Sequence, residues 1–246
     1  MNDSRKQAVK LPPEQQAIRD KCFHPTGAFV EFPRAEIDQS IPQRFEKIVD
    51  KFADRVAVKT KKYTLTYNTL NQTANRIART VYQRCAEKEH PVVLLLLEKD
   101  SPAIATILGV LKAGKMYLVL DPSSPRERLA FMLADSHANL IVTDDKNFPL
   151  AEALVGDQQK LLNIDSPDAN FPNENLGLAI LPDALAYIRY TSGSTGEPKG
   201  ILEYSTSRRN RKQSRIVAFI RRETLSSFQS VTSRCQLHSD RVGNDV

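Results

Sequence analysis

The strongest constraint on the fold is a series of short apolar runs separated by stretches of helical periodicity. The run PVVLLLL at 91–97 is continuously apolar, which is typical of a parallel strand buried on both faces. MYLVL at 116–120 and NLIVT at 139–143 have a similar character. Pro102 and Pro125 stand where the intervening helices should begin. The alternation predicts an α/β fold, with an open, mainly parallel sheet and helices on both faces.

The two intervening helices should each bury one apolar face. We expect the first to end at Gly114, because glycine readily adopts the left-handed conformation found just past helix ends. Its inward residues should be Ile104, Ile107, Leu108 and Leu111. Those of the second helix should be Leu129, Met132 and Leu133.

The segment before the first buried run predicts a helix, a hairpin and a second helix. Ser40 is a suitable N-cap, and Pro42 fits the first turn of a helix. VAVKT at 56–60 and YTLTY at 63–67 resemble the two strands of a hairpin. A long amphipathic helix should follow Thr66. Downstream, the pattern predicts one further helix and two further strands: 148–155, 160–164 and 184–190.

Composition divides the chain into three parts. Residues 1–40 contain several prolines and little periodicity, and we interpret them as an extended leader packed on the body. Residues 41–202 form the body, with nearly balanced charge. Residues 203–246 contain no proline, and the basic excess of the chain lies here, since residues 201–246 hold nine Lys or Arg against four Asp or Glu. We expect this last part to be a basic, disordered tail.

Composition also excludes several classes of protein. The start of the chain is polar and carries no signal peptide, and the longest apolar run is far too short to span a bilayer. Cys22, Cys85 and Cys235 are scattered without metal-ligand spacing, and the four histidines form no ligand pattern either. We therefore expect a cytoplasmic protein with reduced thiols, no membrane contact and no metal site of its own.

The string YTSGSTGEPKG at 190–200 combines hydroxyls and glycines with one lysine. Glycine lets successive backbone N–H groups converge on one point, and the hydroxyls add uncharged donors. Lys199 adds a mobile point charge suited to phosphate. The string is not the common P-loop, which needs Gly-Lys-Ser/Thr, because Pro198 precedes Lys199 here. Composition alone would indicate a flexible surface loop, whereas the chemistry is that of a polyphosphate cradle.

This string resembles the phosphate-loop signature of the adenylate-forming enzymes, which include acyl-CoA ligases, luciferases and the adenylation domains of nonribosomal peptide synthetases. Two other segments resemble adenylation-domain motifs: LTYNTLNQTANRIA at 65–78 and LGVLKAGKMYLVLDPSSPRERLAFMLADS at 108–136. Lys112 and Asp121 match the second motif, and we interpret them as structural residues that end a helix and turn out of a strand. The resemblance covers about residues 41–202.

The resemblance implies an activity, a cofactor and partners. The family reaction is the ATP-dependent activation of an amino or other carboxylic acid to an acyl-adenylate, with release of pyrophosphate and with Mg²⁺ as an expected companion of ATP. A carrier protein or a missing half of the ligase would be a further partner. The residues that would bind the β- and γ-phosphates are Thr191, Ser192, Gly193, Ser194, Thr195, Gly196 and Lys199.

The chain also departs from the family pattern. We find no segment for adenine stacking, magnesium or ribose, and no small domain with a catalytic lysine, so we assign no catalytic residue and no metal ligand. Arg189 replaces an apolar residue in the strand before the signature. An unpaired buried arginine is costly, so either that face is open or the sequence has drifted.

Three functional hypotheses follow from this reading. The first is a truncated adenylate-forming ligase, which we expect to be inactive by itself. The second is a non-catalytic remnant that binds a nucleotide or a partner. The third, less favoured, is a nucleic-acid binder that uses the arginine-rich run at 207–215.

Overall fold

The structure is a computed structural model of the 246-residue chain. It describes residues 12–15, 36, 38–86, 91–98, 100–157, 159–166, 171–192 and 198–205. The chain divides into two compact units, Met1–Glu36 and Ile37–Val246. Most of the expected leader and all of the expected tail beyond residue 205 lie outside the described residues. All described helices and strands from residue 41 onward belong to the second unit.

Helices and strands alternate along this unit. The helices are α2 (Ile41–Phe52), α3 (Tyr67–Arg84), α4 (Ser101–Lys112), α5 (Arg126–Asp135) and α6 (Phe148–Leu154). The strands are β1 (Val56–Lys59), β2 (Thr64–Thr66), β3 (Val92–Leu96), β4 (Met116–Val119), β5 (Leu140–Thr143), β6 (Lys160–Asn163), β7 (Leu185–Ser192) and β8 (Pro198–Tyr204).

The larger sheet has the strand order β6-β5-β3-β4-β7-β8. Neighbouring strands from β6 to β7 are parallel, and β8 returns antiparallel to β7. β3 lies between β5 and β4, so the three apolar runs are neighbours in the sheet. β1 and β2 pair in a separate antiparallel hairpin, also as predicted. The predicted α/β fold is therefore confirmed.

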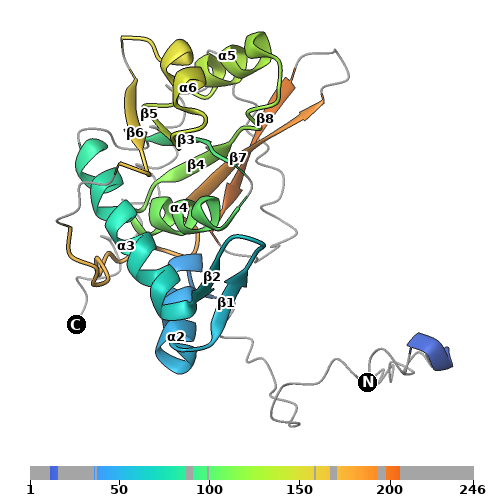
Figure 1. The fold of residues 1–246 in the computed structure, drawn as a ribbon, viewed down its shortest axis with the longest axis vertical. Helices are drawn as coiled ribbons and strands as arrows, with labels where there is room; N and C mark the ends of the chain where they lie inside the picture. Colours follow the sequence, from blue (N-terminus) through green and yellow to red (C-terminus); the bar gives the residue numbers. More distant parts are fainter. Residues whose placement is uncertain are drawn as a thin grey trace, which may run out of the picture. The chain divides into compact units, whose positions relative to one another are not determined.

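β3 separates two apolar cores because all its residues are buried. Leu94 and Leu96 pack with buried side chains of α5 and α6. Val93 and Leu95 pack with α3 and α4 on the opposite face. Figure 1 shows these two helix pairs on opposite sides of the sheet. α3 and α4 approach each other closely at Gly109, where a Cβ atom would stand only 2.8 Å from the Ile77 side chain.

Local signals set the helix ends as expected. Ser40 Oγ accepts a hydrogen bond from Gln43 N, and the Gln43 side chain accepts one from Ser40 N, which together form a capping box at the start of α2. Thr66 caps α3 by accepting from Thr69 N. Gly114 follows α4 with a φ of 68°, a conformation that glycine adopts without the steric cost of a Cβ atom.

One predicted inward residue of α4 was wrong. Ile104 is 39% exposed, whereas Leu108 and Leu111 are buried as expected. α4 is apolar on nearly every side, so helical periodicity does not fix its buried face. The burial of Ala105 and Val110, on other sides of the helix, shows that the neighbouring elements determine the buried face instead.

A buried polar network links α2, α3 and α4 to the segment that precedes β7. Lys112, at the end of α4, is 2% exposed and pairs with Glu46 of α2. Its Nζ also donates to Asn175 Oδ1 at 3.1 Å, and that oxygen accepts from Asn71 and Asn75 of α3 at 3.0 Å each. Burial lowers the pKa of Lys112, while the hydrogen bond and charge of Glu46 act in the opposite direction. These contacts agree with the structural role predicted for Lys112.

Replacing Lys112 with methionine should lower the free energy of unfolding by about 2–3 kcal/mol, because Glu46 loses its cation in a partly buried place. The double change Lys112→Met/Glu46→Leu should recover part of this loss, since no charge then stays unpaired. Lys146→Met is the matched control, because Lys146 pairs with Glu98 at the surface, and its stability should stay close to that of the wild type. Urea unfolding at neutral pH measures all four proteins. Equal stability of Lys112→Met and wild type would contradict the role of the network.

Candidate functional site

The phosphate-loop string forms the end of the β7–β8 hairpin. Antiparallel pairing continues to Thr191 opposite Lys199 and to Ser192 opposite Pro198. Residues 193–197 connect the two strands and lie outside the described residues. The structure thus brings together the two ends of the predicted site, Thr191 on β7 and Lys199 on β8. Both are half-buried.

The other predicted site residues belong to the end of β7 or to the connection that follows it. Ser192 ends β7 through its backbone. Four residues lie outside the described part of the chain: Gly193, Ser194, Thr195 and Gly196. The connection that contains them begins at the carboxyl end of β7, which is parallel to β4. Because the carboxyl ends of parallel strands share one edge, the connection starts at the edge where open α/β sheets bind ligands.

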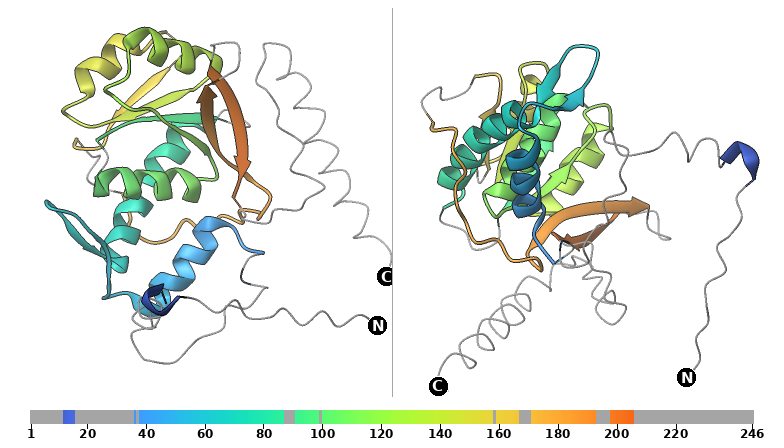
Figure 2. Two further views of the ribbon diagram at one scale, coloured as in Figure 1. Left: turned by 90° about the vertical axis from the view of Figure 1, so that its right-hand side faces the viewer. Right: turned by 90° about the horizontal axis from the view of Figure 1, so that it is seen from below.

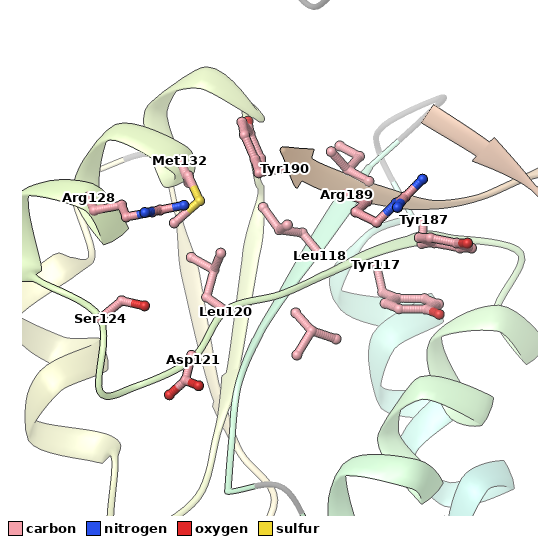
Figure 3. Close-up of a pocket in the computed structure, with 12 residues that line it drawn as sticks. Tyr117, Leu118, Leu120, Asp121, Ser124, Arg128, Met132, Tyr187, Arg189 and Tyr190 are labelled. Atoms are coloured by element: carbon pink, nitrogen blue, oxygen red, sulfur yellow. The ribbon is translucent and has the colours of Figure 1, made fainter. Parts of the chain in front are cut away.

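A cavity of about 380 Å³ lies beside this hairpin. It is lined by β4 and the turn after it, by α5 and by β7 (Figure 3). The pairing of β4 with β7 ends at Leu118 and Ile188, and residues of both strands beyond that pair line the cavity. Asp121 closes the turn after β4, where its Oδ1 accepts from Ser123 N at 3.0 Å and from Ser123 Oγ at 2.7 Å. Asp121 therefore has the structural role that the sequence predicts.

Two stacked tyrosines form one side of the cavity. The rings of Tyr117 and Tyr187 have centroids 5.4 Å apart and are nearly parallel, at 21°. The two residues face each other across the β4–β7 pairing. Burial raises the pKa of Tyr117, and Tyr187 adds to this effect. Tyr117 is therefore neutral at physiological pH.

Tyr190, the first residue of the string, is tied to α5. Its hydroxyl donates to Asp135 Oδ2 over 2.6 Å. Burial raises the pKa of Tyr190 well above its usual range, and the hydrogen bond and charge of Asp135 raise it further. The phenol therefore stays protonated and able to donate at any physiological pH.

Arg189 points away from the core. Its side chain is 58% exposed, and its Nη2 pairs with Glu203 of β8 over 2.9 Å. Of the two explanations offered for this arginine, the structure supports an open face. A pair this exposed adds little to stability.

The opposite end of the hairpin is held against α2. Ser205 N donates to Ala184 O at 2.8 Å. The Ser205 hydroxyl oxygen accepts from Ile41 N, at the start of α2, at 3.1 Å. β8 itself continues to Tyr204, two residues beyond the predicted end of the body at residue 202. Figure 2 shows the hairpin extending from the α5 side of the sheet to the α2 side.

Sequence reasoning missed two residues of this arrangement, Asp135 and Ser205. A carboxylate in the last turn of a helix opposes the helix dipole, so the position of Asp135 was a readable signal of a specific partner. Ser205 gave no such signal, because its contacts involve the backbone of distant residues. Among the described residues, no group of three or more His, Cys, Asp or Glu could hold a metal ion. No helix in the same part of the chain is long and apolar enough to cross a membrane.

Comparison with known proteins identifies this arrangement. The family model for AMP-binding enzymes matches residues 45–206. Tyrocidine synthase 3 from Brevibacillus parabrevis is 35% identical over 167 residues, which are 68% of this chain and 3% of that protein. Gramicidin S synthase 2 from Aneurinibacillus migulanus is 39% identical over 166 residues, 67% of this chain and 4% of that protein.

Solved structures give the same result. The nonribosomal peptide synthetase FmoA3, in its AMPPNP-bound form, aligns with a TM-score of 0.61 and 26% identity, over 79% of this chain and 20% of that one. The N-terminal subdomain of NpsA from Klebsiella oxytoca, in complex with 3-hydroxybenzoyl-AMSN, aligns with a TM-score of 0.57 over 68% of this chain and 41% of that one. At 24% identity, the second likeness shows the fold alone.

The fold and the hairpin thus define the class, which is part of an adenylation domain. The chain belongs to the AMP-binding enzyme family and is related to the adenylation domains of nonribosomal peptide synthetases. It spans far less than two thirds of the length of each relative named above.

The raised pKa of Tyr190 predicts a difference in stability at alkaline pH. A group whose pKa is raised by folding contributes stability below its unfolded pKa, about 10 for tyrosine, and this contribution is lost as the pH rises above that value. The wild type should therefore lose free energy of unfolding more steeply than Tyr190→Phe between about pH 9 and pH 11. The difference in slope should be up to about 1.4 kcal/mol per pH unit, reduced by solvent screening of the half-exposed ring. Urea unfolding of the wild type and of Tyr190→Phe at successive pH values tests this prediction. Tyr117 is present in both proteins, so its titration does not contribute to the difference between them. Parallel pH profiles would contradict the prediction.

Proposed function

We propose that this chain is the phosphate-loop part of an adenylate-forming ligase and binds the triphosphate of ATP. The observation that carries the proposal is the pairing of Thr191 with Lys199 at the base of the loop. In this position a hydroxyl and an ammonium group flank the same connection, which holds four further positions of the family signature: Gly193, Ser194, Thr195 and Gly196. The proposed phosphate-binding residues are Thr191, Ser192, Gly193, Ser194, Thr195, Gly196 and Lys199.

The chemistry of the loop suits the leaving group of the family reaction. When a carboxylate attacks the α-phosphorus of ATP, negative charge develops on the departing pyrophosphate. Backbone N–H groups, hydroxyls and Lys199 can stabilise that charge and orient the triphosphate. The AMPPNP complex of FmoA3 supports a nucleotide as the ligand of this family. The described residues contain no cluster that fits Mg²⁺, so we assign no magnesium ligand and no step through the metal.

The complete reaction needs parts beyond this chain. Adenine, ribose and acid contacts must hold the α-phosphorus against the carboxylate, and the chain covers only 20% of FmoA3. We therefore infer that the chain alone binds a triphosphate but does not activate a carboxylic or amino acid. A protein that supplies the missing part of the ligase would be its first partner, and a carrier protein a second. The fused NpsA–ThdA protein from Klebsiella oxytoca is an adenylation–PCP di-domain. A non-catalytic protein that binds a nucleotide or a partner is the alternative proposal.

Binding of a triphosphate should depend on Lys199. We expect ATP and inorganic tripolyphosphate to bind weakly to the full chain, and more weakly as salt is raised. Lys199→Ala should weaken binding about three- to tenfold, because one charge-assisted contact at a half-exposed site is lost. Lys59→Ala, on the separate β1–β2 hairpin, is the matched control and should bind like the wild type. Isothermal titration calorimetry measures the affinities. Equal affinity in Lys199→Ala and wild type would contradict the assignment of Lys199.

ATP–pyrophosphate exchange should stay at background for the purified chain with amino, aryl or fatty acids. Oriented proximity can supply about 7–11 kcal/mol of barrier lowering, and the contacts that orient the α-phosphorus and the acid are not in this chain. Losing half of that amount slows the step several hundredfold or more, by roughly 1.4 kcal/mol per factor of ten. Exchange above background that disappears in Lys199→Ala would show that the chain is an active enzyme.

A further inference from the structure

The β7–β8 hairpin is held at both ends by contacts outside the hairpin. At the end away from the loop, Ser205 bonds to Ala184 and to the start of α2. At the loop end, one such contact is the hydrogen bond from the Tyr190 hydroxyl to Asp135. Tyr190 comes immediately before Thr191 and lies opposite Gly200 in the pairing. It is therefore at the base of the phosphate loop, although it is not one of the proposed phosphate-binding residues.

Asp135 is well placed to act as a fixed point. It is the last residue of α5, a helix that buries Leu129, Met132 and Leu133 in the core. The Tyr190 ring packs against the same core cluster. Figure 3 shows Tyr190 extending from the end of β7 toward α5. The strand and the helix are thus joined by apolar packing and by one short hydrogen bond.

The position of Asp135 is unfavourable for the helix itself. The carboxyl end of a helix carries partial negative charge, so a carboxylate there is disfavoured. The last turn of α5 contains no basic residue that would offset it. The Tyr190 hydroxyl donates a hydrogen bond to this carboxylate. A hydrogen bond to a charged acceptor is stronger than one between neutral groups. Asp135 therefore attaches β7 to α5 at some cost to the stability of the helix itself.

We propose that Asp135 is a positioning residue for the phosphate loop and acts through Tyr190. The hydrogen bond holds the last residues of β7 against α5, and it thereby fixes the paired residues Thr191 and Lys199 at the base of the loop. Fewer conformations of the loop base then have to be given up when a triphosphate binds. The ordering of the loop base is inferred from the geometry of Tyr190 and Asp135 alone. The expected change in triphosphate affinity rests in addition on the proposed function.

The first arm of the test measures amide hydrogen exchange at the loop end of the hairpin in the full chain without ligand. Tyr190→Phe keeps the ring packing and removes the hydroxyl, and Asp135→Ala removes the acceptor. Each should raise exchange at the amides of Thr191 and Lys199 about tenfold, as expected for loss of a charged hydrogen bond. The double variant should exchange no faster than either single variant, because one interaction is lost in all three. Asp135→Asn keeps an acceptor oxygen and should restore most of the protection.

The control removes a buried hydroxyl elsewhere in the domain. Thr106 is fully buried in α4, and its Oγ1 donates to Pro102 O at 2.8 Å. Thr106→Val should lower the melting temperature but leave exchange at the loop end unchanged. An equal rise in Thr106→Val would show that general destabilisation explains the effect. Unchanged exchange in both Tyr190→Phe and Asp135→Ala would also overturn the proposal.

The second arm measures binding of inorganic tripolyphosphate and of ATP to the same proteins. Affinity should fall about three- to tenfold in Tyr190→Phe and Asp135→Ala, and recover in Asp135→Asn. If the wild type binds neither ligand, the proposed function fails while the exchange arm still decides whether Asp135 positions the loop. If the wild type binds and the variants bind equally well despite faster exchange, the positioning role in ligand binding is overturned.

Discussion

The burial of β3 on both faces is the constraint on which the rest of the structure depends. A strand with apolar side chains on both sides needs a helical layer above and below it. Parallel neighbours joined by helical crossovers provide both layers, with α3 and α4 on one face and α5 and α6 on the other. The same arrangement gathers the carboxyl ends of the parallel strands at one edge. β7 carries the phosphate-loop string to that edge, so the place of the candidate site follows from how the core is covered.

The long connection between β6 and β7 is held by a different means. The described parts of this connection, 164–166 and 171–184, contain neither helix nor strand. Side chains of α3 bond to it instead: Arg79 donates to Pro172 O and Glu174 O, and Asn75 donates to Asn173 O. Backbone carbonyl groups near a core need such partners. Asn175 then joins the connection to the buried Lys112. Hydrogen bonds from side chains thus hold this segment in place, whereas apolar packing holds the sheet.

Sequence predicts the parts of this protein that depend on local pattern. Continuous apolar runs identified the central strands, and Ser40 and Gly114 marked helix ends, because each signal lies within a few residues of the feature it predicts. The exposure of Ile104 and the hydrogen bond between Tyr190 and Asp135 depend on which distant elements pack together. Periodicity within a segment therefore could not predict either of them. The chemistry of the phosphate-loop string indicated Lys199, and its resemblance to the family signature implied Thr191. The string could not give the hairpin register that places them opposite each other, because that register is set by the pairing of two whole strands.

The antiparallel return of β8 has a consequence for the order of folding. β7 and β8 are joined by a short connection, so they can pair soon after both have been synthesised, at a small entropic cost of loop closure. The pairing of β7 with β4 joins Tyr117 to Tyr187 across 70 residues of chain, and such distant contacts form more slowly. We therefore expect the hairpin to form as a unit and to dock on the parallel sheet afterwards. Nascent chains would then acquire the base of the phosphate loop before they acquire the cavity beside it.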